Sequence, residues 1–239
     1  MPTINDYLNL AETAFASYAS NLRIGNGNAL EYERAVMTKT QATRFDASWQ
    51  VLDQQDLSNG FSAVLFQQVD QQGNPVGDKV LAIRGTEPSY WGIDYLTDVI
   101  NIAVLGTNVG MPQYSSLKSF YQTLVSQGKL GTSEQVVVTG HSLGGFLAQA
   151  FTAEHNAVVS AAYTYNAPGF SASPGVIFNY ATQLLEFFGI TDATIPNDKI
   201  TNIRATEGLS ATAGLGQMVD LFRKFQSSPL LIQSIITPL

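Results

Sequence analysis

The chain has 239 residues, of which 45% are hydrophobic and 13% charged, so it has the apolar content of one packed domain and not of a disordered segment. Its net charge is -7 and its twelve Lys and Arg form no basic stripe, which excludes nucleic acid as a partner. Cysteine is absent, which excludes disulfides, thiolate metal sites and a cysteine nucleophile.

A helix is predicted near the start of the chain, over residues 4–20. Apolar side chains recur there at helical spacing, and Thr3 stands where a helix cap is expected. This region lacks the basic and apolar parts of a secretory signal. No segment approaches the ~18 consecutive apolar residues of a membrane span.

A hairpin is predicted next, followed by alternating helices and strands. The hairpin pairs short apolar runs at 62–66 and 79–84. A helix over 114–127 precedes the β-branched run at 135–139, whose flanking glycines are typical of a strand buried on both faces. Strand signals recur at 158–165 and at 199–205, each after a segment with helical potential. This order predicts an α/β fold with a central, mostly parallel sheet.

A G-x-S-x-G motif directly follows the strand at 135–139. It reads Gly140-His141-Ser142-Leu143-Gly144 and leads into a helical stretch, which is the context of a nucleophile elbow. Such a turn forces unusual dihedrals on the serine, and the two glycines remove side chains that would clash. We therefore predict that Ser142 is the nucleophile and that the backbone N–H of Leu143 donates to the oxyanion of acyl transfer. The alternative is a glycine-rich connection without chemistry.

Four segments together resemble the fungal-type (class 3) lipase family of the α/β-hydrolase superfamily, particularly its bacterial secreted members. They follow the family order and read Ile83-Arg84-Gly85-Thr86, Asp94-Tyr95-Leu96-Thr97-Asp98, Gly140-His141-Ser142-Leu143-Gly144-Gly145 and Asn166-Ala167-Pro168-Gly169. The resemblance implies a three-layer sandwich. It makes Thr86 the second oxyanion-hole donor, braced by Asp94 and Asp98, whereas the alternative for Thr86 is an ordinary turn residue at a strand end.

A serine hydroxyl needs a histidine to take its proton and an acid to orient that histidine. In this fold both follow the nucleophile, on loops after later strands. The family's aspartate lies where the strand at 199–205 ends, so the resemblance assigns the acid to Glu207, with Glu in place of Asp. Asp192 and Asp198 are alternatives, and Glu207 could also be a solvated loop carboxylate.

Neither histidine of the chain suits the role of the base. His141 neighbours the nucleophile in sequence and is expected to point away from it. His155 follows Ser142 along the same helix, which at ~1.5 Å per residue puts it roughly 20 Å away. The resemblance places the base beyond Glu207, where this sequence has no histidine.

Three explanations for the missing base are considered, in order of preference. They are a fragment whose histidine lies on a separate C-terminal polypeptide, a truncated chain, and a pseudoenzyme that binds acyl ligands without turnover. The apolar stretch at 229–239 favours an interrupted chain. Residues 1–239 are thus expected to form a single lipase-like domain that lacks its C-terminal part.

The predicted function is that of a lipase or carboxylesterase acting through an acyl-enzyme on Ser142. Its partner is an acyl ester or lipid, with peripheral contact to lipid surfaces, and the apolar segments 91–105 and 178–190 are candidate lids. No cofactor and no metal are expected, because no ligand cluster is present. The resemblance implies an extracellular location. The alternatives are a catalytically incomplete lipid- or acyl-binding module on the same fold, and a thioesterase or acyltransferase.

Overall fold

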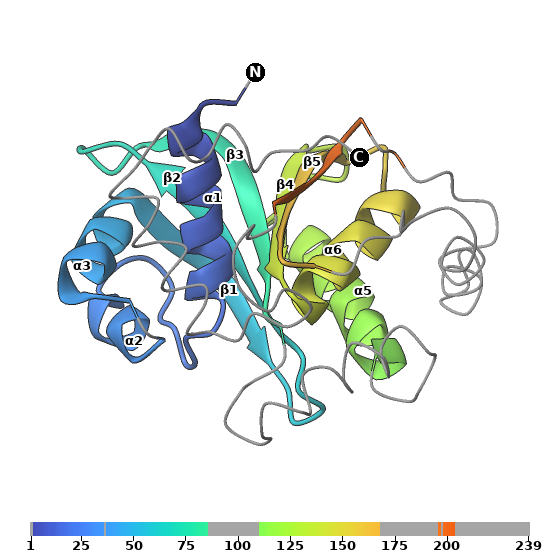
Figure 1. The fold of residues 1–239 in the computed structure, drawn as a ribbon, viewed down its shortest axis with the longest axis horizontal. Coiled ribbons are helices and arrows are strands. Elements are labelled where there is room, and N and C mark those ends of the chain that lie inside the picture. The colour runs from blue at the N-terminus through green and yellow to red at the C-terminus, as the bar shows by residue number, and fades with distance from the viewer. Residues whose placement is uncertain (1, 36, 86–109, 168–195, 197, 204–239) are drawn as a thin grey trace.

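A central sheet of six strands organises the molecule (Figure 1). The computed structural model describes residues 2–35, 37–85, 110–167, 196 and 198–203, and the structural statements below concern these residues. The strands are β1 (Trp49–Asp56), β2 (Ser62–Val69), β3 (Pro75–Ile83), β4 (Val136–His141), β5 (Val159–Tyr165) and β6 (Ile200–Ile203). They lie side by side in chain order, antiparallel from β1 to β3 and parallel from β3 to β6.

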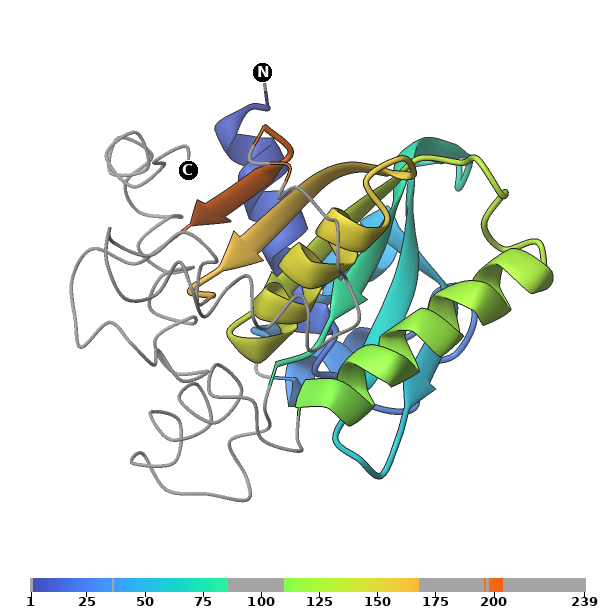
Figure 2. The ribbon, with the colours of Figure 1, turned by 90° about the vertical axis from the view of Figure 1, so that its right-hand side faces the viewer.

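Helices cover both faces of this sheet (Figures 1 and 2). They are α1 (Ile4–Ala16), α2 (Ala29–Arg34), α3 (Lys39–Ser48), α5 (Gly110–Ser126) and α6 (Leu143–Glu154). α1, α2 and α3 share one buried cluster with one face, and α5 and α6 share a second cluster with the other. Because successive strand residues point to opposite faces, Val64 of β2 joins the first cluster and Leu65 joins the second. The α/β prediction is confirmed, with helices layered on either side of the sheet.

The predicted elements that fall within the described residues are present, with shifted boundaries, whereas the helical segment predicted before the strand at 199–205 lies outside them. The predicted cap at Thr3 is confirmed, since its hydroxyl accepts from the Asp6 N–H at 3.3 Å and its own N–H donates to the Asp6 carboxylate at 2.6 Å. The helix that follows ends at Ala16 and not at residue 20. The parallel strands lie close to where the sequence puts them, whereas β1 has no counterpart among the predictions.

The carboxyl ends of four parallel strands meet at one edge of the sheet. Ile83 of β3 pairs with Gly140 of β4, His141 pairs with Tyr165 of β5, and Tyr165 pairs with Ile203 of β6. In open α/β sheets, ligands bind outside the carboxyl ends of the strands. This edge, where Ser142 follows β4, is therefore where the functional residues are to be sought.

Candidate active site

Ser142 connects β4 to α6 in a strained conformation. Its φ is 53° and its ψ is -122°, a combination that residues with a side chain rarely adopt. Strain of this kind costs about 1–3 kcal/mol and persists only where the surrounding structure imposes it. The Ser142 N–H donates to the carbonyl oxygen of Tyr165 at 3.0 Å, and its own carbonyl accepts from Phe146 N–H at 3.1 Å. The sharp turn predicted from the motif is present.

The Ser142 hydroxyl does not stabilise the helix that it precedes. A serine at this position normally accepts a hydrogen bond from an N–H in the first helical turn. Ser142 makes no such bond, and within the described part of the chain its hydroxyl has no hydrogen-bond partner at all. The residue is 5% exposed. The hydroxyl is therefore largely shielded from solvent and makes no hydrogen bond that stabilises the described structure.

Glycines allow the backbones around Ser142 to touch. A Cβ on Gly140 would lie 2.4 Å from the carbonyl carbon of Gly144, and a Cβ on Gly144 would lie 2.2 Å from the carbonyl oxygen of Ile83. A Cβ on Gly145 would lie 2.6 Å from that of Ala167. No side chain fits into such gaps, so the first turn of α6 packs directly on β3 and β4. The steric role predicted for the two motif glycines is present.

Leu143 is the first residue of α6 and is buried. The N–H groups of the first helical turn have no partner within their own helix, and the helix dipole adds partial positive charge there. The predicted donor therefore sits where an anion is favoured. Thr86, the other predicted donor, lies outside the described residues. The residue before it, Gly85, is described: a Cβ there would lie 2.5 Å from the carbonyl oxygen of His141.

Of the three candidate acids, only Asp198 is described. Asp198 is exposed and precedes β6, at the edge where the parallel strands begin. Ser142 lies at the opposite edge, so the two residues are not brought together. Glu207 and Asp192 lie outside the described residues, as do Asp94, Asp98 and the two candidate lids. The described chain reaches the carboxyl end of β6 at Ile203, shortly before Glu207.

His141 is the residue before Ser142, and its ring is engaged elsewhere. It is 2% exposed, and its Nδ1 lies 3.0 Å from the hydroxyl of Tyr18, which follows α1. Sequence analysis does not single out Tyr18, because 123 residues separate it from His141.

His155 lies at the far end of the helix that Ser142 begins. It caps the C-terminus of α6, a helix of 12 residues, so about 18 Å of helix separates it from Ser142. Its ring packs on Phe151 and Tyr121, at centroid distances of 4.3 and 5.0 Å. Burial lowers its pKa. Neither histidine is positioned to take the proton of Ser142.

The elbow also lies in a segment that matches a known protein family. Residues 10–176, more than half of the chain, match the family model of the Tle-like phospholipase domain. The chain belongs to the Tle-like phospholipase family. No curated protein matches it.

The Tle-like phospholipase match starts within α1 and extends beyond β5, so it includes the elbow at Ser142. It supports a lipase- or phospholipase-like assignment. It does not support the narrower assignment to class 3 lipases, which was based on four short segments. The elbow and the strand end before Thr86, which carried that resemblance, both lie within the matched range.

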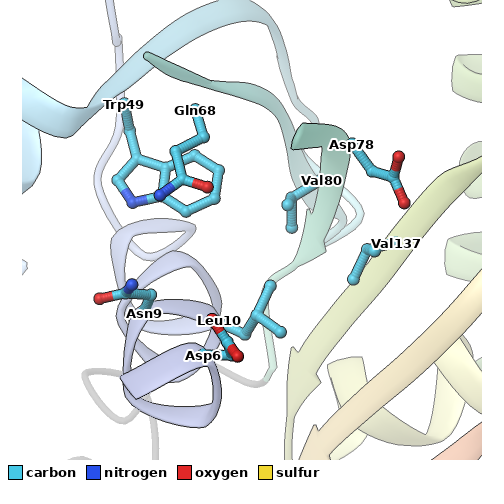
Figure 3. Close-up of a pocket in the computed structure, with 8 residues that line it drawn as sticks. All are labelled: Asp6, Asn9, Leu10, Trp49, Gln68, Asp78, Val80 and Val137. Atoms are coloured by element: carbon cyan, nitrogen blue, oxygen red, sulfur yellow. The ribbon is translucent and has the colours of Figure 1, made fainter. Parts of the chain in front are cut away.

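The Tle-like phospholipase domain also carries a pocket of about 150 Å³ away from Ser142 (Figure 3). It lies between α1 and the sheet, next to Val80 of β3 and Val137, near the beginning of β4. Its polar lining comes from Asp6, Asn9, Gln68 and Asp78. The pocket is therefore closer to the amino-terminal edge of the parallel strands than to the elbow.

Sites of two other kinds are absent from the described residues. They contain no group of three or more His, Cys, Asp or Glu residues that could hold a metal ion. None of their helices is long and apolar enough to cross a membrane.

Proposed function

We propose that this chain hydrolyses carboxylic esters of lipids through an acyl-enzyme formed on Ser142. One observation carries the proposal: the serine is held at φ 53° between a buried strand and a helix, and its hydroxyl caps nothing. A serine that served only the helix would use its oxygen for the first-turn N–H groups. Membership in the Tle-like phospholipase family supports a lipid ester as the substrate.

The first half of the reaction acylates the serine. The Ser142 oxygen bonds to the acyl carbon while its proton passes to a base, and the carbonyl oxygen becomes an oxyanion. The N–H groups of Leu143 and Thr86 are the proposed donors to this oxyanion, and donors of this kind typically contribute about 10²–10³-fold in rate. The ester C–O bond then breaks, and the alcohol leaves with the proton.

The second half returns the serine to its free form. Water gives a proton to the same base while its oxygen bonds to the acyl carbon. The bond between that carbon and the Ser142 oxygen then breaks, the base returns the proton to this oxygen, and the carboxylic acid leaves. Glu207 is the proposed acid that orients the base. Because His141 and His155 are both committed elsewhere, we place the base on a histidine outside these 239 residues. An extracellular location and peripheral contact with lipid surfaces are part of the same proposal.

Covalent labelling tests the nucleophile. The protein with its full native sequence is incubated with a fluorophosphonate, and mass spectrometry locates the adduct. We expect the adduct on Ser142 and its loss in Ser142→Ala. Ser126→Ala, which changes an exposed serine near the end of α5, is the matched control and should label like the wild type.

Two results would contradict the proposal. An adduct that still forms in Ser142→Ala would show that Ser142 is not the nucleophile. Fatty-acid binding without labelling or ester turnover in the full native protein would favour the alternative of a non-catalytic acyl-binding module.

A further inference from the structure

Tyr18 lies where three segments of the Ser142 site meet. Its hydroxyl is 3.0 Å from Nδ1 of His141, in the elbow. The same hydroxyl lies 2.5 Å from where a Cβ on Gly85 would be, so it packs directly against the backbone at the end of β3. The carbonyl oxygen of His141 lies equally close to that position. One hydroxyl group thus contacts both strand ends that flank the proposed oxyanion hole.

The backbone that carries Tyr18 is anchored on both sides. In α1, before it, the Thr13 hydroxyl is 3.0 Å from that of Thr139 of β4, and both threonines are fully buried. After it, the side-chain amide of Gln54, from β1, donates to the Ala19 carbonyl at 2.6 Å. These contacts fix the turn after α1 to two different strands. The Tyr18 ring therefore extends from a rigid base toward the elbow.

The residues that Tyr18 contacts immediately precede the groups on which acyl transfer depends. His141 precedes Ser142, and Gly85 precedes Thr86. A misplacement of about 1 Å between reacting groups can cost on the order of 10²-fold in rate. We propose that Tyr18 is a positioning residue for this reaction, whose hydroxyl keeps the nucleophile elbow and the strand end at Gly85 in register. This inference rests on the proposed function of Ser142.

Tyr18→Phe tests the inference because it removes one oxygen and keeps the ring. In the full native protein we expect kcat for p-nitrophenyl ester hydrolysis to fall about tenfold with KM unchanged, since alignment in the transition state is lost and not substrate binding. The matched control is Tyr114→Phe. Tyr114 donates its hydroxyl to Glu154 at 2.5 Å, at the end of α6 opposite Ser142, so this variant loses a comparable bond and should keep kcat.

A spectroscopic measurement separates positioning from general loss of stability. The 239 residues contain only His141 and His155, so their ring ¹⁵N signals can be assigned by substitution. Tyr18→Phe should shift the Nδ1 signal of His141 and leave those of His155 unchanged, which also shows that the variant is folded. Tyr114→Phe should leave the His141 signals unchanged.

The outcomes distinguish this inference from the proposed function. Absence of fluorophosphonate labelling at Ser142 in the wild type contradicts the proposed function, and the inference falls with it. Wild-type labelling together with an unchanged kcat in Tyr18→Phe overturns the inference alone. A rise in KM at constant kcat, or an unchanged His141 signal, also overturns it.

Discussion

Residue 144 is a glycine, and the absence of a side chain there determines how closely α6 approaches the end of β3. Gly144 approaches the Ile83 carbonyl so closely that the smallest side chain would overlap it. The turn at Ser142 therefore depends on neighbours that have no side chain. At the scale of single residues, the geometry of the candidate site therefore depends on glycines as well as on the serine.

Gly144→Ala should therefore unfold or distort the elbow. Its Cβ would meet backbone at 2.2 Å, which no side-chain movement relieves, and we expect a loss of about 3 kcal/mol or more in the free energy of unfolding. Gly73→Ala is the control, because a Cβ there meets nothing within 4 Å and only its φ of 82° is unfavourable. Urea unfolding measures both variants, and equal losses would contradict this account of the packing.

Individual residues of the site differ in how far sequence reveals them. Ser142, Leu143 and the glycines belong to one short motif, so spacing alone singles them out as candidates. Tyr18 does not, since its contact with His141 bridges 123 residues and depends on how α1 lies on the sheet. Nothing in the local pattern around Tyr18 distinguishes it from a core aromatic.

At the scale of elements, the buried strands were predictable, whereas β1, at one edge of the described sheet, was not. β4 and β5 are rich in β-branched and small residues and are largely buried, which leaves a clear signal in the sequence. β1 is only partly buried and continues through Asp53, Gln54, Gln55 and Asp56, a polar run that favours a loop. β1 is a strand because it pairs with β2, and the residue pattern within β1 alone does not predict that pairing.

The end of α6 gives a prediction for pH. Burial is the largest effect on the pKa of His155 and lowers it from its ordinary value of 6.5. Of the two smaller effects, Glu154 raises this pKa and Lys118 lowers it further. Below pH 6.5 the unfolded chain therefore gains a proton before the folded chain does. Stability from this residue is fully present above that pH and is lost as the pH falls toward the lowered folded-state pKa.

His155→Phe should remove that share of the pH dependence while keeping a ring beside Phe151 and Tyr121. We expect the free energy of unfolding to fall less between about pH 7.5 and 5.5 in the variant than in the wild type. Denaturant titrations at the two pH values measure this difference. Equal pH dependence would show that His155 is not buried in its neutral form.

At the scale of the whole molecule, charge bears on which lipid surface is favoured. The chain carries a net charge of -7, and like charges repel over a distance set by the ionic strength. If the substrate is presented in a bilayer, an anionic surface opposes approach and a zwitterionic one does not. This effect is independent of the elbow's chemistry.

Vesicle co-sedimentation tests this expectation. We expect the full native protein, with Ser142→Ala to prevent turnover, to bind zwitterionic phosphatidylcholine vesicles more tightly than vesicles containing anionic phosphatidylserine at low salt. Added salt should narrow the gap, because it screens the repulsion. Stronger binding to the anionic vesicles would point to a local basic contact that outweighs the net charge.

The depth at which α6 is buried limits how such an enzyme could be regulated. Every residue of this helix from Leu143 to Ala153 is buried, and its first turn rests on two strands without intervening side chains. The turn that carries Ser142 is therefore held by closely packed backbone, and we expect it to move little while the domain stays folded. Control of turnover would have to act on the route by which an ester arrives or on the group that accepts the proton.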